Sequence, residues 1–222
     1  MIVAEQKPIA EIREYIAPYK RTLVLGCGTC VKTCFAGGED EVAALASALR
    51  IALKKDGKEA SIDELTIERQ CENEFIYEAA GKINENDAVL SLACGAGVQA
   101  MAKEYATVPV LPGLNTTFMG IQEDRGVFAE ECRGCGDCEL ARFGGVCPVT
   151  RCSKKLLNGP CGGSKNGECE IDPDVKCAWQ LIIDRLAALG QLDNLKIYRP
   201  PKNWSSSLSG GPRKLVREDH II

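Results

Sequence analysis

Residues 21–55 read RTLVLGCGTCVKTCFAGGEDEVAALASALRIALKK. The apolar run Arg21–Gly26 ends in small residues, which is typical of a buried strand in a parallel sheet. After Gly37 and Gly38 come acidic residues, then apolar residues at helical spacing, then lysines, an order that suits the helix dipole. This stretch therefore predicts a strand followed by a helix over residues 39–55, the repeating unit of an α/β fold.

The same alternation continues along the first half of the chain. Further strands are expected at Glu64–Arg69, Asp87–Ala93 and Val108–Leu111. Helices are expected from about Glu72 to Ile83 and from about Val98 to Tyr105. Strands and helices at this spacing predict a doubly wound parallel sheet over residues 1–125.

Cysteine is the residue type that stands out in the composition. There are 13: Cys27, Cys30, Cys34, Cys71, Cys94, Cys132, Cys135, Cys138, Cys147, Cys152, Cys161, Cys169 and Cys177. An odd number, in a chain with no secretion signal, argues against a disulfide scaffold. The only histidine, His220, is expected to be a solvated tail residue, which leaves mixed Cys/His zinc sites and haem without ligands. Metal bound by thiolates is the better explanation.

The first five cysteines follow the predicted strands. Cys27 comes after the first strand, Cys71 after the second and Cys94 after the third, while Cys30 and Cys34 lie in the loop after the first. Parallel strands place their carboxyl ends along one edge, where ligands of open α/β sheets usually bind. These thiols are therefore expected to converge. The alternative is that they pack as small apolar residues in the core.

Residues 126–178 hold the other eight cysteines, among many glycines. Such a segment buries little apolar surface, so bound metal must supply folding energy. Cys132, Cys135 and Cys138 are spaced C-x2-C-x2-C, and Cys147-Pro148 follows. This resembles the bacterial ferredoxin pattern, although the last gap is eight residues where ferredoxins have about three. Overlapping C-x2-C pairs favour a 4Fe–4S cluster over zinc.

Four more thiols follow at gaps of eight, seven and seven residues: Cys152, Cys161, Cys169 and Cys177. Both a second 4Fe–4S cluster and a structural four-cysteine zinc site fit this spacing. Spacing leaves open which cysteine joins which site.

The end of the chain is predicted to be a helix and a tail. Asp172-Pro173 suits an N-cap with proline at the first helical position, and Gly190 suits the C-terminal cap. The tail from Arg199 is expected either to wrap over this chain or a partner, or to be disordered. The predicted domains are 1–125, 126–198 and 199–222.

The composition and motifs argue against several function classes. The net charge of −4 gives no footprint for nucleic acid or a membrane surface. The N-terminus does not resemble a signal peptide, and the longest apolar stretch, residues 88–102, is interrupted by glycines, so a cytoplasmic protein is expected. Residues 95–100 (GAGVQA) fit a loose dinucleotide pattern but are interpreted as a tight turn. No Walker A pattern or catalytic triad is recognisable, and no catalytic residue is predicted.

Three segments carry a resemblance to a known family. They are GGVCPVTRCSKKLLNGPCGGSKNGECE (144–170), CAWQLIIDRLAALGQLDNL (177–195) and NWS (203–205). This region resembles the C-terminal domain associated with methylenetetrahydrofolate reductases, and the full chain is similar to the separate small subunits of MetV type. LLNGPCGG, with the downstream ECE and CAW, is the most specific part.

The resemblance implies a partner, a TIM-barrel flavoprotein subunit that carries FMN and reduces methylenetetrahydrofolate. Subunits of this type are described as iron–sulfur or zinc proteins of the Wood–Ljungdahl pathway. The chain is then expected to relay electrons from a donor such as ferredoxin to that FMN, through two or three 4Fe–4S clusters, with zinc as an alternative in one four-cysteine site. The expected N-terminal ligands are Cys27, Cys30, Cys71 and Cys94, with Cys34 as the substitute; the other eight cysteines would form two further sites.

The sequence leaves two alternative functions open. The first is a zinc-binding structural or regulatory subunit of the same reductase, which docks without conducting electrons. The second is an iron–sulfur subunit of another anaerobic oxidoreductase.

Overall fold

The computed structural model describes residues 1–207 and 210–221, which form two compact units. Unit 1 is Met1–Ala129 and unit 2 is Glu130–Ile222. The boundary predicted after residue 125 falls at the turn before the last strand of unit 1, and the three-part division stays a prediction.

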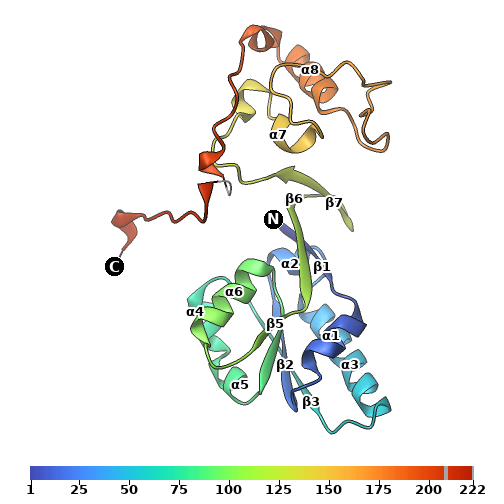
Figure 1. The fold of residues 1–222 in the computed structure, drawn as a ribbon, viewed down its shortest axis with the longest axis vertical. Helices are drawn as coiled ribbons and strands as arrows, with labels where there is room; N and C mark the ends of the chain where they lie inside the picture. Colours follow the sequence, from blue (N-terminus) through green and yellow to red (C-terminus); the bar gives the residue numbers. More distant parts are fainter. Residues whose placement is uncertain (208–209, 222) are drawn as a thin grey trace. The chain divides into compact units, whose positions relative to one another are not determined.

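Unit 1 is built on a parallel sheet of four strands in the order β3-β2-β4-β5 (Figure 1). The strands are β2 Arg21–Cys27, β3 Ser61–Ile67, β4 Ala88–Leu92 and β5 Val110–Pro112. β2 is the first of these four strands along the chain. It lies inside the sheet, with β3 on one side and β4 on the other, and all pairs are parallel. The predicted parallel sheet is confirmed.

Helices cover both faces of this sheet, as Figure 1 shows. On one face lie α1 Ile9–Ile16 and α3 Glu39–Lys55, which pack their apolar side chains against β2 and β4. On the other lie α4 Asn73–Glu78, α5 Ala80–Asn84 and α6 Gly95–Glu104. The single helix predicted over residues 72–83 is thus two short helices, because the chain bends at Ala79.

Unit 1 also contains an antiparallel sheet that the sequence pattern did not predict. Its order is β1-β6-β7, with β1 Ile2–Gln6, β6 Leu114–Asp124 and β7 Val127–Cys132, so β7 carries the chain into unit 2. β6 is mostly exposed, so it lacks the alternating apolar signal of a half-buried strand. Gly120 allows the β6–β7 contact, since a Cβ atom there would lie 1.9 Å from the carbonyl oxygen of Ala129.

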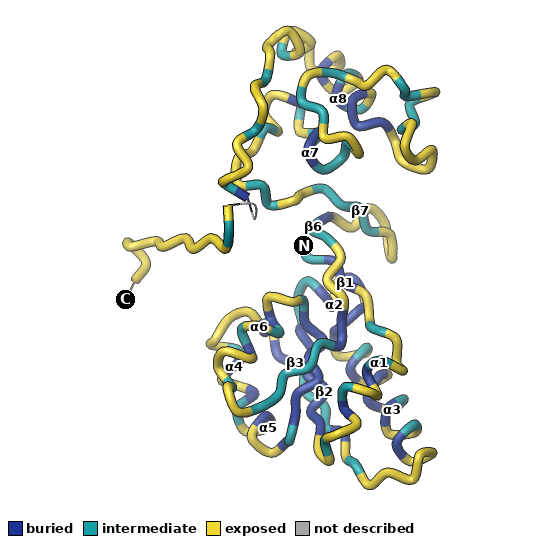
Figure 2. The backbone as a smooth tube through the Cα atoms, viewed as in Figure 1, coloured by how far each residue is buried: buried dark blue, intermediate teal, exposed yellow. Residues whose placement is uncertain are grey.

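Unit 2 is mostly irregular, and its buried residues are few (Figure 2). Its α-helices are α7 Pro148–Arg151 and α8 Ala178–Ala188; its described 3-10 turns are η1 Leu140–Arg142, η2 Leu192–Lys196, η3 Trp204–Ser206 and η5 Glu218–His220. A small core joins Phe143 to Trp179 on α8, with ring centroids 5.7 Å apart in an edge-on contact. The scarcity of apolar contacts agrees with the glycine-rich composition.

The predicted start of the last helix is wrong. Asp172 and Pro173 instead form a turn, in which the Asp172 carboxylate accepts a hydrogen bond of 3.0 Å from the Asp174 N–H. Aspartate favours such turns as readily as N-caps, and here the turn places Cys177 at the N-cap of α8. The predicted C-terminal cap is correct: Gly190 has φ +66°, and the Gln191 N–H donates to the Leu186 carbonyl (2.8 Å).

Candidate metal centres

Three thiols converge at the carboxyl edge of the parallel sheet. Cys27 is the last residue of β2, Cys94 is the N-cap of α6 just beyond β4, and Cys71 follows β3. Burial raises the pKa of the Cys71 thiol, and the neighbouring Cys27 and Cys94 sulfurs raise it further. β3 lies on one side of β2, and the next strand along the chain, β4, lies on the other side. The three thiols therefore lie where the strand order reverses, which is the usual ligand site of open α/β sheets.

A buried polar network holds these strand ends together. The Gln70 side chain is fully buried and donates to the carbonyl oxygens of Leu25 (2.8 Å) and Gly26 (3.0 Å) on β2. Its carboxamide oxygen accepts a 2.6 Å hydrogen bond from the Ser91 hydroxyl on β4. Gln70 precedes Cys71, and Gly26 precedes Cys27, so the network fixes the backbone next to two of the three thiols.

Glycines let the chain approach this edge closely. A Cβ atom on Gly37 would lie 2.0 Å from the carbonyl oxygen of Leu92, so only glycine fits there. The Gly37 carbonyl accepts a 2.8 Å hydrogen bond from the Cys27 N–H. On α6, a Cβ atom on Gly97 would lie 2.8 Å from that of Ala93 and 3.0 Å from that of Gln70. The GAGVQA segment is therefore not the predicted tight turn: residues 95–100 form the first part of α6, where Gly97 allows the helix to lie close to Ala93 and Gln70.

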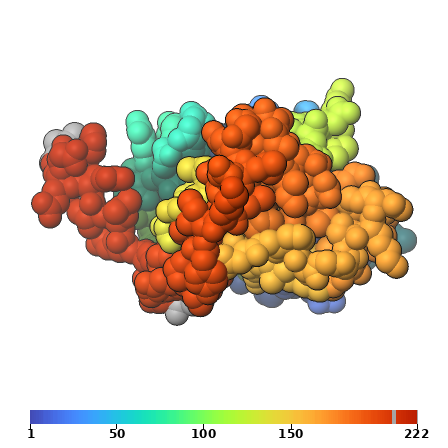
Figure 3. All heavy atoms as spheres, turned by 90° about the horizontal axis from the view of Figure 1, so that it is seen from above, coloured from blue at the N-terminus to red at the C-terminus, as the bar shows by residue number. Residues whose placement is uncertain are grey.

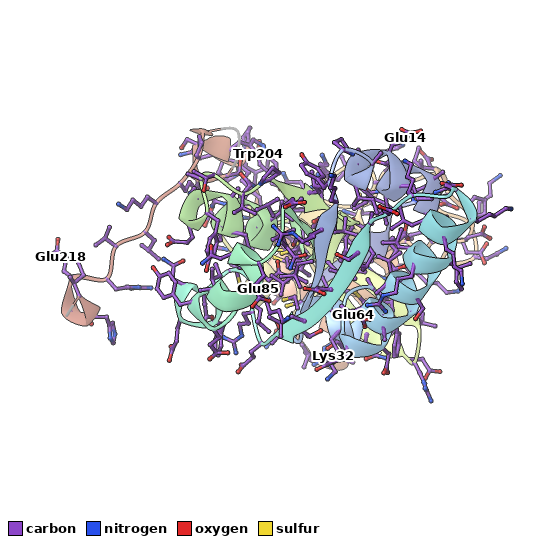
Figure 4. The ribbon with its side chains drawn as sticks, turned by 90° about the horizontal axis from the view of Figure 1, so that it is seen from below. Glu14, Lys32, Glu64, Glu85, Trp204 and Glu218 are labelled. Atoms are coloured by element: carbon purple, nitrogen blue, oxygen red, sulfur yellow. The ribbon has the colours of Figure 1, made fainter. Side chains whose placement is uncertain are left out.

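Cys30 and Cys34 lie at the two ends of the short helix α2 (Cys30–Thr33). Cys34 belongs to the apolar core, and its thiol contacts the carbonyl oxygens of Val31 (3.5 Å) and Ala4 (3.6 Å). Burial raises its pKa, which favours the protonated thiol. Cys30 is only half-buried. An ion pair of 2.8 Å from Lys32 to Glu39 joins α2 to α3 at the surface. Lys32 is labelled in Figure 4.

In unit 2, the tail binds the loop that carries Cys132, Cys135 and Cys138. The Ser206 hydroxyl donates to the Cys135 carbonyl (3.0 Å), and Arg213 donates to the Gly134 carbonyl (2.9 Å). Lys202 forms an ion pair of 3.0 Å with Asp137.

In the NWS segment, Asn203 caps the 3-10 turn η3, because its side chain accepts a 3.0 Å hydrogen bond from the Ser205 N–H. The C-terminal end of the tail, coloured red, extends away from the rest of unit 2 (Figures 1 and 3). Leu215 and Ile221 there are 77% and 68% exposed. The described residues Lys202, Ser206 and Arg213 therefore contact this chain's own Cys132–Cys138 loop, while the expectation for the tail as a whole stays a prediction.

The LLNGPCGG segment, residues 156–163, is held by Trp179 on α8 and by Arg199 at the start of the tail. The Trp179 ring N–H donates to the Leu156 carbonyl (3.2 Å). Asn158 and Arg199 exchange two hydrogen bonds, from the Asn158 amide to the Arg199 carbonyl (2.8 Å) and from the Arg199 N–H to the Asn158 oxygen (2.6 Å). Arg199 also pairs with Glu139 (2.6 Å). This segment therefore links α8 to the tail.

The last four cysteines line one small cavity, of about 20 Å³, in unit 2. They are Cys152, Cys161, Cys169 and Cys177. Trp179 forms one part of the cavity wall, and the ion-paired side chains of Lys154 and Glu170 form another part. The pKa of Cys169 is lowered, chiefly by the Ile171 backbone and next by the Ser153 hydroxyl, so its thiolate is favoured.

All thirteen cysteines are free thiols, with the softness that zinc and iron–sulfur clusters require. Within residues 1–207 and 210–221, no group of three or more His, Cys, Asp or Glu side chains is already arranged to hold a metal ion. The residue types and their convergence fit thiolate ligation, whereas the assignment of ligands stays a prediction.

Several positioning residues have no recognisable signal in the sequence. Gln70 and Ser91 gave no signal, since an isolated glutamine and serine have no motif. Asn158 and Arg199 lie within or beside the segments that resemble the family, but their pairing depends on the tertiary fold. Across the described parts of the chain, no helix has the length and apolarity to cross a membrane.

Together the two units define a class of protein, a cysteine-rich α/β protein whose free thiols are its candidate functional groups. Residues 111–205 match the family model described as methylene-tetrahydrofolate reductase C terminal. The match is consistent with a MetV-type small subunit and agrees with the resemblance carried by the LLNGPCGG segment. No curated protein and no solved structure shows significant similarity to the chain.

Proposed function

We propose that this chain is the iron–sulfur electron-transfer subunit of a two-subunit methylenetetrahydrofolate reductase. It would accept electrons from a ferredoxin-type donor in the cytoplasm and pass them to the FMN of a TIM-barrel catalytic subunit. The reaction would belong to the Wood–Ljungdahl pathway. The family match over residues 111–205 supports the link to a reductase complex.

The observation that carries the proposal is the convergence of Cys27, Cys71 and Cys94 at one edge of the sheet. Three strand ends supply them, so the thiols meet only when the sheet forms. Half-buried Cys30 is the fourth ligand that we propose, because the Cys34 thiol is packed in the apolar core against the carbonyl oxygens of Ala4 and Val31. A 4Fe–4S cluster held by four thiolates carries one electron at a time.

The chain's own residues would set the reduction potential. Backbone N–H groups that donate to ligand sulfurs stabilise the more negative, reduced form. Two such bonds are present in unit 2, from Gly134 to the Cys132 sulfur (3.3 Å) and from Gly163 to the Cys161 sulfur (3.5 Å). In unit 1, the Gln70–Ser91 network would keep the thiol-bearing strand ends in place.

The flavin and folate sites are assigned to the partner. The parallel sheet in the described residues has four strands, whereas a TIM barrel closes with about eight. We therefore assign the barrel to the partner subunit and propose that this chain contributes electron delivery.

A zinc-bearing docking subunit is the second candidate. The observation that favours it is the small cavity lined by Cys152, Cys161, Cys169 and Cys177, whose volume of about 20 Å³ is close to that of a single water-sized site. In that case unit 2 would dock on the reductase without conducting electrons.

An anaerobic flavin-reduction experiment separates the two candidates. Reduced ferredoxin is mixed with the catalytic subunit alone, with the subunit plus this chain, and with the subunit plus the Cys71→Ala variant. We expect the flavin absorbance to bleach fast only with the unmodified chain. The Cys34→Ala variant is the matched control and should support the same rate. Equal bleaching without the chain, or with the Cys71→Ala variant, would contradict the relay and favour docking.

A further inference from the structure

Unit 2 has eight cysteines, and spacing alone does not divide them between sites. We propose that four of them close a single metal centre of their own, separate from the set on the loop that the tail binds. The four are Cys152, Cys161, Cys169 and Cys177. The proposal rests on thiolate ligation, which it shares with the proposed function, and does not require electron transfer.

The first support is the cavity itself. All four side chains line the same space, although they come from positions 25 residues apart at the extremes (177 − 152). None of Cys132, Cys135, Cys138 and Cys147 contributes to its lining. The volume of about 20 Å³ is enough for one water-sized centre, so binding of a cluster would push the four segments apart.

The second support is the geometry of α7, which separates Cys147 from Cys152. Cys147 is the N-cap and Cys152 the C-cap of this single helical turn. Five residues along a helix correspond to a rotation of about 140° and a rise of about 7.5 Å, so the two side chains leave the turn in different directions. Cys147 contacts the Thr150 hydroxyl (3.6 Å) on its own side.

The third support is that backbone hydrogen bonds fix the segments bearing the other three thiols. The Gly163 N–H donates to the Cys161 sulfur (3.5 Å). The Cys169 N–H donates to the Val175 carbonyl (2.8 Å), and the Cys177 N–H donates to the Gly167 carbonyl (2.8 Å). Two antiparallel bridges, Lys165 to Glu168 and Glu168 to Lys176, hold the same turn. Such preordering lowers the entropy lost when a metal binds.

The chemistry shared by the possible occupants is ligation by four thiolates. A structural zinc ion and a 4Fe–4S cluster both take a set of four cysteines. Either would attach the LLNGPCGG segment to α8, because Cys161 belongs to the first and Cys177 caps the second. The few apolar contacts of unit 2 make this attachment a source of folding energy.

Metal stoichiometry in a double-mutant comparison tests the pairing. The full chain is purified anaerobically as Cys161→Ala, Cys169→Ala and the double variant, and zinc, iron and sulfide are measured per chain. Because one centre is lost in each case, the double variant should lose no more metal than either single variant. Loss of about one zinc would identify a single ion, and loss of about four irons a cluster.

The matched comparison pairs Cys169→Ala with Cys138→Ala. These two losses should add in the double variant, because the residues belong to different centres. The proposal is overturned if Cys138→Ala and Cys169→Ala together lose only what each loses alone, or if the losses from Cys161→Ala and Cys169→Ala add.

A second measurement needs no variant. The unmodified chain is treated with a chelator in steps, alkylated after each step and analysed by mass spectrometry. We expect Cys152, Cys161, Cys169 and Cys177 to become reactive together, at a step different from the other four. Reactivity that rises residue by residue, or jointly across all eight, would contradict two separate centres. Failure of flavin reduction alone would leave this result unaffected, so the two proposals fail in distinguishable ways.

Discussion

The carboxamide oxygen of Gln70 accepts a 2.6 Å hydrogen bond from the hydroxyl of Ser91, and both side chains are completely buried. The other end of Gln70 donates to two β2 carbonyls. One side chain thus connects the ends of β2 and β4, and it immediately precedes Cys71. Because buried polar groups are costly when unpaired, this network specifies one arrangement of the thiol-bearing edge.

Replacing Ser91 by alanine tests the network. The Ser91→Ala variant leaves the Gln70 oxygen buried without its hydrogen-bond partner, which costs about 1–3 kcal/mol of the free energy of unfolding. Urea unfolding of the full chain measures this as a lower midpoint. Ser61→Ala is the control, since Ser61 lies exposed at the start of β3 and should change the free energy by less than about 0.5 kcal/mol. Equal midpoints for the two variants would disprove the role of the network.

Two glycines in helices are predicted to respond oppositely to alanine. Gly97→Ala places a Cβ atom 2.8 Å from that of Ala93, so overpacking should cost about 1–3 kcal/mol despite the better helix propensity of alanine. Gly81→Ala meets nothing within 4 Å and should stabilise the chain by about 0.4–1 kcal/mol. Thermal unfolding of both variants checks the signs, and a stabilising Gly97→Ala would refute the close contact between α6 and the sheet edge.

The Asn158–Arg199 pair is predicted to keep the tail on unit 2. Asn158→Ala removes both hydrogen bonds, whereas Asn158→Asp keeps the oxygen that accepts from the Arg199 N–H. Limited proteolysis should therefore cut the segment after Arg199 fastest in Asn158→Ala, at an intermediate rate in Asn158→Asp and slowest in the unmodified chain. Identical cleavage rates in all three would mean that other contacts hold the tail.

Cys30 and Cys34 are predicted to differ in metal binding although they are four residues apart. Cys34→Ala removes a core thiol bonded to backbone carbonyls and should leave the iron and zinc content unchanged. Its cost should be a loss of stability of about 1 kcal/mol from the buried volume. Cys30→Ala should lose the whole N-terminal centre. Metal analysis of the two variants decides, and the opposite pattern would make Cys34 the ligand.

The parallel sheet was predictable because its signals are local. The run Arg21–Gly26 and the helix over residues 39–55 each have a pattern that burial on a sheet requires. Strand ends then place Cys27, Cys71 and Cys94 at one edge by topology alone.

The rest depended on contacts between distant residues. β6 is too exposed to show an apolar alternation, and its pairing with β1 joins residues more than 100 positions apart. Asp172-Pro173 has two local solutions, an N-cap and a turn, and tertiary packing around Cys177 selects the turn. The gathering of the last four cysteines at one cavity likewise follows from the folded loop, since gaps of eight, seven and seven residues match no single pattern.

The most direct test of the electron-transfer account is to measure the metal that the chain carries. The full chain is purified anaerobically, alone and with its catalytic partner, and iron, sulfide and zinc are determined per chain alongside EPR of the reduced protein. The account predicts about eight to twelve irons, matching sulfide and signals of reduced 4Fe–4S clusters. Near-stoichiometric zinc with no reducible iron would contradict it and leave a docking subunit.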